Sequence, residues 1–250
     1  MTAVPYVVLI FLVWAINAAS PAFAKEVHMS TNECVIVLHG MGRTARSMKK
    51  LEKSLTAAGY SVWNRSYPSR SRSIEDLAAN AIEPAVKYCE QIAAAKIHFV
   101  THSLGGILIR YYLQAHAMDN LGRIVMLSPP NHGSEVADLL GNIFLYRWLV
   151  GPAGQQLGTD SSTLPNAMQP IAGEIGVITG NKSSDPWFSP FIPGPDDGKV
   201  SVRSAKLSEM TDFMVVPCGH TTIMNNTFVV AETLYFLQHG AFRRALPLAM

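Results

Sequence analysis

The chain has 250 residues, of which 48% are hydrophobic and 15% are charged, and its formal net charge is +2. This length is enough for one α/β domain with a full hydrophobic core. The nearly balanced charge, with no basic block, excludes nucleic acid as a partner and favours catalysis or small-ligand binding.

The start of the chain has the pattern of a targeting segment. Residues 1–24 carry no charged side chain, and an apolar run over residues 4–16 precedes Ala22-Phe23-Ala24, which has the small-x-small form of a cleavage site. We therefore predict a signal peptide over residues 1–24 and a secreted or periplasmic mature domain over residues 25–250. The alternative is an uncleaved N-terminal membrane anchor, because the apolar run could just span a bilayer.

Apolar runs and helical patterns alternate along the rest of the chain. Strands are predicted for the short apolar runs at residues 34–38, 60–63, 97–102, 123–127, 176–180 and 213–217. Five helices are predicted between and after these strands. The first ends near residue 58, the second covers residues 73–92, the third follows Ser103, the fourth starts near residue 134, and the fifth covers residues 228–238. Pro84 should kink or split the second of these helices. The alternation predicts an α/β fold with a mostly parallel sheet and helices on both faces.

The three cysteines are Cys34, Cys89 and Cys218. An odd and small number does not suggest a disulfide framework, and the spacing fits no metal-binding motif. Cys34 opens an apolar strand, and Cys89 lies on the apolar side of a predicted helix. We therefore predict that both are buried free thiols, and we predict no metal site.

Residues 97–106, Ile-His-Phe-Val-Thr-His-Ser-Leu-Gly-Gly, form the motif around which the chain is organised. An apolar strand, a turn with Ser103 at its apex and a helix are the layout of a nucleophile elbow. Such a turn lifts the serine hydroxyl clear of the backbone and aims the amide of Leu104 toward a developing oxyanion. Thr101 stands where the commonest pattern, G-x-S-x-G, has its first glycine. The alternative is an ordinary strand-to-helix turn.

An activated serine also needs a histidine to take its proton and a carboxylate to hold that histidine. In α/β hydrolases these groups occur in the order Ser, Asp, His, and Ser103, Asp197 and His220 fill that order, each after a predicted strand. Asp196 and Asp212 compete with Asp197 for the place of the acid. We predict that these three residues form a catalytic triad.

Five motifs make the chain resemble the α/β-hydrolase superfamily, specifically its bacterial lipase and esterase branch. They are His39-Gly40-Met41-Gly42, Thr101-His102-Ser103-Leu104-Gly105-Gly106, Pro129-Pro130-Asn131-His132-Gly133-Ser134, Asp197-Gly198-Lys199-Val200 and Gly219-His220. The resemblance implies that Asp197, which precedes Gly-x-Val, is the acid rather than Asp196. It also implies an oxyanion hole formed by the backbone N–H groups of Met41 and Leu104.

His39 and His132 each follow a predicted strand at the same edge of the sheet. We predict that they are substrate-binding residues rather than the base. Arg65, Arg70 and Arg72 gather in a loop at this edge, where they either orient an anionic head group or are simply solvated.

Residues 141–170 depart from the regular alternation. Residues 143–150 are apolar and aromatic, and residues 151–165 are rich in Gly, Ser, Thr and Pro. A long irregular segment in a compact domain is usually a lid or a binding loop, so we predict a cap over the site. The alternative is a helix packed on the sheet, followed by an ordinary long loop.

The predicted activity is that of a serine hydrolase that cleaves carboxylic esters, as lipases and esterases do, through an acyl-enzyme. We expect a small-molecule or lipid ester as substrate, water as the second substrate, no cofactor, and either peripheral or N-terminal membrane association. Two alternatives share the same residues. One is an acyltransferase in which an alcohol replaces water, and the other is a non-catalytic binding protein with the hydrolase fold.

Overall fold

The computed structural model describes residues 32–183 and 187–243, so the predicted signal peptide at residues 1–24 lies outside the described residues. The described strands form one parallel sheet in the order β2-β1-β3-β4-β5-β6. All lie close to the predicted strand positions, with the bounds β1 (Glu33–Leu38), β2 (Ser61–Asn64), β3 (Lys96–His102), β4 (Leu121–Leu127), β5 (Ile175–Gly180) and β6 (Asp212–Val216).

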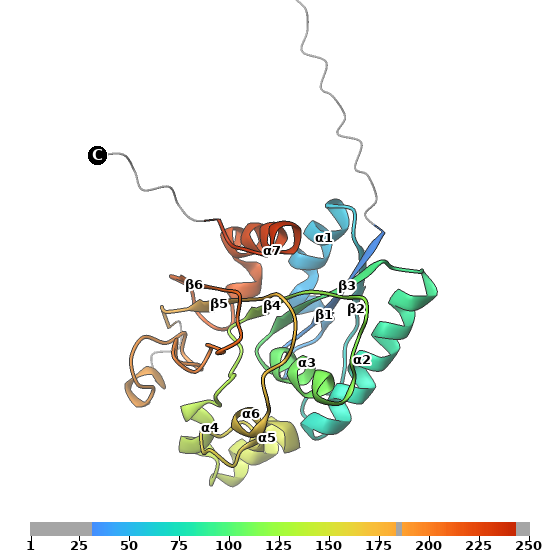
Figure 1. Cartoon of the computed structure of the whole chain (residues 1–250). Coiled ribbons are helices and arrows are strands. Elements are labelled where there is room, and N and C mark those ends of the chain that lie inside the picture. Colours follow the sequence, from blue (N-terminus) through green and yellow to red (C-terminus); the bar gives the residue numbers. More distant parts are fainter. Residues whose placement is uncertain (1–31, 184–186, 244–250) are drawn as a thin grey trace, which may run out of the picture.

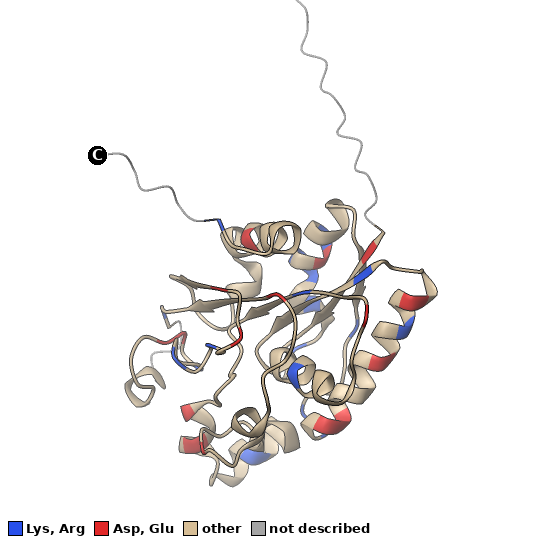
Figure 2. Ribbon diagram, in the orientation of Figure 1, with Lys and Arg blue, Asp and Glu red and all other residues tan. Residues whose placement is uncertain are grey.

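Helices cover both faces of the sheet, as predicted. Figure 1 shows α1 (Lys49–Ala57) and α7 (Thr227–His239) on one face, with α2 (Ile74–Gln91) and α3 (Leu104–Ala115) on the other. Each face has its own hydrophobic core. The strands are continuous apolar runs because both of their faces are buried. Charged residues accordingly lie mainly on the helices and loops (Figure 2).

Pro84 does not split α2, which runs unbroken from Ile74 to Gln91. Of the predicted kink or split, the split does not occur. Pro84 lies on the exposed side of the helix, and the buried stripe continues past it through Ala81, Ala85 and Cys89. Packing of this stripe on the sheet outweighs the loss of one hydrogen bond.

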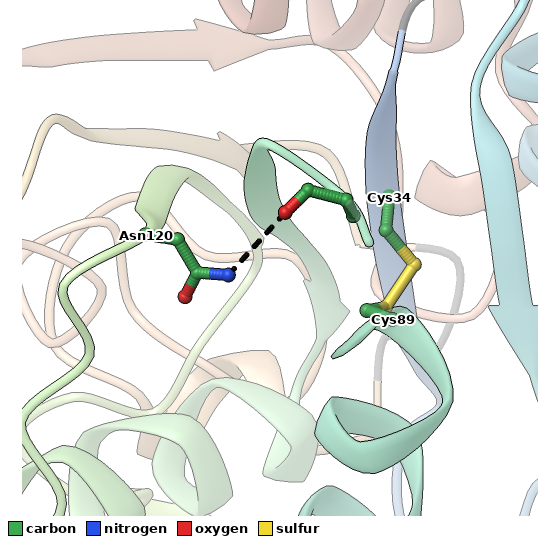
Figure 3. Close-up of a disulfide and its surroundings, with 4 residues drawn as sticks. Cys34, Cys89 and Asn120 are labelled. Carbon is green, nitrogen blue, oxygen red and sulfur yellow. Dashed lines mark hydrogen bonds between the residues drawn. A yellow bond between two sulfur atoms is a disulfide. The ribbon is translucent and has the colours of Figure 1, made fainter. Parts of the chain in front are cut away.

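A disulfide joins Cys34 in β1 to Cys89 in α2, with their Cα atoms 5.7 Å apart (Figure 3). The prediction of free thiols was wrong for this pair. Both residues do face the interior, but α2 packs against β1 so that the two side chains meet at bonding distance. The residues are 55 positions apart, so their spacing alone could not reveal this contact. Cys218 is buried and free.

The motifs predicted to be catalytic lie where the strand order reverses. β2 and β3 lie on opposite sides of β1 in the sheet. The connections that leave the carboxyl ends of β1 and β3 therefore run in opposite directions along the sheet. Open parallel sheets bind their ligands at such a point. Ser103 follows β3, and the loop that contains Met41 follows β1.

The segment predicted as a cap contains short helices rather than a long irregular loop. They are α5 (Phe144–Gln155) and α6 (Leu164–Ala167), and α4 (Glu135–Leu140) lies directly before the segment. Gly151 interrupts α5 with a φ of 69°, and a Cβ there would lie 1.7 Å from the carbonyl oxygen of Arg70. Only glycine fits this contact.

The remaining elements are the 3₁₀ helices η1 (Ala45–Met48), η2 (Ser189–Phe191) and η3 (Ile223–Asn225). Over residues 32–183 and 187–243, no helix has both the length and the apolar character needed to cross a bilayer.

Candidate active site

Ser103 lies at the turn between β3 and α3 in a conformation that ordinary residues rarely adopt. Its φ is 52°, and it is the N-cap of α3. A positive φ at a non-glycine residue is uncommon and tends to occur at functional turns. Gly105 permits the close packing of this turn, because a Cβ there would lie 2.7 Å from the carbonyl oxygen of Leu38. Thr101 is fully buried, so a β-branched residue fits at the first position of the motif.

The structure brings together the side chains of Ser103, His220 and Asp197. The Ser103 hydroxyl lies 3.0 Å from Nε2 of His220, and Nδ1 of His220 lies 2.8 Å from the Asp197 carboxylate. A carboxylate can only accept, so Nδ1 carries the proton and Nε2 is free to accept from the hydroxyl. Such an arrangement can take the serine proton during attack on a carbonyl, while the carboxylate stabilises the imidazolium.

Asp197 is almost fully buried, yet its surroundings favour the ionised form. Its Oδ1 atom accepts from the amides of Lys199 and Val200 at 3.1 and 2.9 Å. Burial alone would raise the pKa of Asp197. The electrostatic interaction and hydrogen bond with His220, together with the hydrogen bond from the Val200 amide, outweigh burial and hold that pKa below its usual value.

The competing carboxylates have other partners. Asp196 accepts from the Ser189 hydroxyl at 2.8 Å and from the Gly198 amide at 2.7 Å. Asp212 starts β6 and accepts from the amide of Phe242 at 2.9 Å. Of the three aspartates, Asp197 is the one that contacts His220.

The amides of Met41 and Leu104 are available to an oxyanion. In the described part of the chain, neither amide has a hydrogen-bond acceptor, whereas the neighbouring amide of Gly42 donates to the Ser69 hydroxyl at 2.9 Å. Leu104 is the first residue of α3, so its N–H group also contributes to the positive end of the helix dipole.

The loop after β2 holds the loop that carries Met41. The Tyr67 hydroxyl donates to the carbonyl of His39, the Tyr67 amide donates to Nε2 of His39 at 3.2 Å, and the two rings stack 3.9 Å apart. Since Nε2 of His39 accepts, the ring is neutral and its Nδ1–H donates to a backbone carbonyl at 2.9 Å. Burial lowers the pKa of His39, which favours this neutral form. We name Tyr67 and Ser69 the oxyanion-loop clamp.

A pocket of about 610 Å³ opens beside Ser103 and His220. Its wall is mainly apolar and comes largely from α4, α5 and their flanks, through Val136, Ala137, Leu140, Ile143, Leu145, Tyr146, Leu149, Val150 and Leu157. On the outer side of the same segment, Phe144 and Trp148 are 82% and 73% exposed.

The family model that describes palmitoyl protein thioesterases matches residues 34–158, which is half of the chain. The chain belongs to the palmitoyl protein thioesterase family. This is a family of thioesterase- and esterase-like hydrolases. The matched region contains Ser103 and Met41, whereas Asp197 and His220 lie beyond it. No curated protein matches the sequence.

Solved structures similar to this thioesterase-family chain include bacterial lipases and esterases. The mature lipase of Bacillus licheniformis has a TM-score of 0.67 at 18% identity, and the match covers 84% of this chain and 93% of the lipase. A phospholipase from Legionella pneumophila has a TM-score of 0.62 at 18% identity, over 83% of this chain and 59% of the phospholipase. A thermophilic esterase from Thermogutta terrifontis has a TM-score of 0.52 at 13% identity, over 85% and 92% of the two chains. These similarities confirm the predicted α/β-hydrolase fold.

Neither of the histidines predicted to bind substrate lines the pocket of this thioesterase-family chain. His39 is fully buried and stacks on Tyr67. His132 is exposed, lies 2.9 Å from the side chain of Asn166, and lines a separate polar hollow. Both follow a strand, but local packing engages their side chains outside the pocket that contains Ser103. Among the described residues, no group of three or more His, Cys, Asp or Glu is placed to hold a metal ion.

Sequence reasoning gave His102 no role, although the thioesterase-family structure places it against the base. Its Nε2–H donates to the backbone carbonyl of His220 at 3.0 Å. Burial, followed by the electrostatic interaction with His220, holds the pKa of His102 well below its usual value, so the ring stays neutral. His102 therefore connects the turn of Ser103 to the loop of His220 and acts as a positioning residue. Its place beside the serine was the only sequence signal.

Proposed function

We propose that this protein is a serine hydrolase that cleaves acyl esters or thioesters through an acyl-enzyme. The proposal rests on the Ser103–His220–Asp197 chain of hydrogen bonds, with distances of 3.0 and 2.8 Å. Ser103 Oγ attacks the carbonyl carbon while its proton passes to Nε2 of His220. The proton then passes to the departing alcohol or thiolate as the bond to the acyl group breaks.

Water completes the reaction. His220 takes a proton from a water molecule, the resulting hydroxide attacks the acyl-enzyme, and the acid leaves as Ser103 recovers its proton. In both tetrahedral intermediates, the amides of Met41 and Leu104 stabilise the oxyanion. One such contact contributes about 3 kcal/mol to lowering the barrier.

The apolar pocket supports an acyl chain as the part of the substrate that is buried. Its wall comes mainly from α5, within the predicted cap at residues 141–170, and from α4 directly before it, so we assign both the role of a cap that binds the chain. The exposed Phe144 and Trp148 on the outer side of the cap support peripheral contact with a lipid surface.

The deciding experiment compares the wild-type protein with Ser103→Ala on a panel of p-nitrophenyl esters and acyl thioesters of increasing chain length. We expect turnover to be lost without loss of the fold, as judged by circular dichroism. A fluorophosphonate probe should label the wild-type protein but neither Ser103→Ala nor His220→Ala. Full hydrolysis by Ser103→Ala would refute the proposal.

We further propose that the mature domain is secreted or periplasmic after removal of residues 1–24. The Cys34–Cys89 disulfide supports this location, because disulfides form and persist in oxidising compartments. N-terminal sequencing of the exported protein should begin at Lys25. An intact N-terminus in the membrane fraction would instead support the anchor.

A further inference from the structure

The charged residues of the pocket are all basic. Arg43, Arg70 and Lys199 line it, and no described aspartate or glutamate does. The rest of the wall is mainly apolar, so the pocket combines a hydrophobic surface with positively charged side chains. A substrate that fills it would need an apolar chain and an anionic group.

Two of these cations have no internal role. Within residues 32–183 and 187–243, no hydrogen bond or ion pair engages the guanidinium of Arg43 or Arg70. By contrast, Arg123 pairs with Glu174 at 2.6 Å. An arginine fork without a protein partner at the mouth of a pocket is free to bind carboxylate or phosphate oxygens bidentately.

Both arginines lie next to the predicted oxyanion hole. Arg43 follows Met41 by two positions, and Cδ of Arg70 lies 3.6 Å from the place of a Cβ on Gly42. The backbone of Arg70 is held in place, because its carbonyl packs against Gly151. The side chain of Arg70 therefore extends from a fixed point to the loop that carries Met41 and Gly42.

We propose that Arg43 and Arg70 form a subsite for a phosphate group on the leaving-group side of the acyl ester or thioester. This assignment rests on the proposed function. The acyl chain belongs with the apolar wall of α4 and α5, where a charge would be poorly solvated. An anion bound beside the scissile carbonyl must therefore belong to the alcohol or thiol that leaves. That phosphate comes either from a lipid head group or from a soluble phosphorylated thiol.

The test uses a double variant and a matched control. Arg43→Gln with Arg70→Gln removes the two pocket charges. Arg46→Gln with Arg72→Gln removes the same charge from exposed arginines that do not line the pocket. Three substrates share one acyl chain: a coenzyme A thioester, phosphatidylglycerol in mixed micelles, and a neutral p-nitrophenyl ester.

We expect the pocket variant to lower the ratio of kcat/KM for a phosphate-bearing substrate to that for the neutral ester by about 10-fold, mainly through KM. The control variant should keep the wild-type ratio. High salt should lower the wild-type ratio and leave that of the pocket variant nearly constant. A fall for the thioester alone identifies the soluble source, and a fall for the phospholipid alone identifies the head group.

An equal loss on all three substrates, or an equal effect of the control variant, would overturn the subsite. Wild-type protein that turns over none of the three and resists the fluorophosphonate probe would overturn the proposed function itself. The two failures are therefore distinguishable.

Discussion

The two sides of the pocket are built in opposite ways. On the side of the sheet, polar groups are buried and hydrogen-bonded, as shown by Asp197, which is 1% exposed and has partners on both oxygens. On the side of α5, apolar groups are exposed, as shown by Leu145, which lines the pocket and is 67% exposed. Fixed polar groups suit chemistry that depends on sub-ångström placement, whereas an apolar surface suits a flexible chain of variable length.

This contrast predicts that the polar side sets the rate, and Asp197→Asn tests that prediction most strongly. The amide cannot hold His220 in the tautomer that accepts from Ser103, so we expect kcat to fall by about 10³- to 10⁴-fold. Steady-state kinetics on one ester measure the change. Asp196→Asn is the control, because Asp196 contacts Ser189 and Gly198 rather than the imidazole. A small effect at Asp197 would remove the acid from the proposed triad.

The oxyanion-loop clamp allows a finer test of the same side. Ser69→Ala removes the acceptor for the Gly42 amide beside Met41, and we expect kcat to fall by about 10-fold with little change in KM. The affinity of a boronate inhibitor should fall in parallel, because the inhibitor reproduces the tetrahedral oxyanion. Ser66→Ala in the same loop, where the hydroxyl accepts from Ala45, should have a much smaller effect.

The apolar side should instead set the preference for chain length. Leu145→Ser with Leu149→Ser places two hydroxyls on the pocket wall, and we expect about 5-fold loss of kcat/KM for long-chain over short-chain esters. Phe144→Ser is the matched control, since this residue lies on α5 and is exposed but does not line the pocket. If the double variant keeps the wild-type preference for chain length, the apolar side of the pocket does not set that preference.

Acid should weaken the fold modestly through the buried histidines of the polar side. The pKa of both His39 and His102 is lowered by burial, so below about pH 6.5 the unfolded chain binds protons that the folded chain does not. The free energy of unfolding should therefore decrease as the pH is lowered below about 6.5, by at most about 1.4 kcal/mol per pH unit for each histidine. Urea denaturation between pH 8 and pH 5, at intervals of about one unit, measures this slope.

His102→Gln should reduce that slope, because glutamine does not titrate. His132→Gln should leave it unchanged, since His132 is exposed. A slope that is identical in all three proteins would show that the buried histidines do not control acid stability.

The sequence predicted the parts of the molecule that depend on order along the chain. Each candidate triad residue follows a strand, and parallel strands bring such positions to one edge, which is why Ser103, Asp197 and His220 could be selected. What could not be predicted depends on how separate elements pack. The role of Tyr67 arises from the loop after β2 meeting the loop after β1, and nothing in its local sequence indicates that contact.

The same limit explains the two misplaced histidines. Sequence locates the end of a strand to within a residue or two, but a rotation of one residue decides whether a side chain faces the pocket or the interior. Neither His39 nor His132 reaches the pocket, because His39 is buried against a tyrosine ring and His132 lines a neighbouring hollow.

The Cys34–Cys89 bond fastens the amino end of β1 to the last turns of α2, far along the strand from the residues around Ser103. The disulfide and the candidate active site thus lie at opposite ends of the parallel strands. Reduction of this disulfide would lower the stability of the fold without changing the residues around Ser103. In a reducing buffer, we therefore expect resistance to unfolding to decrease before activity does.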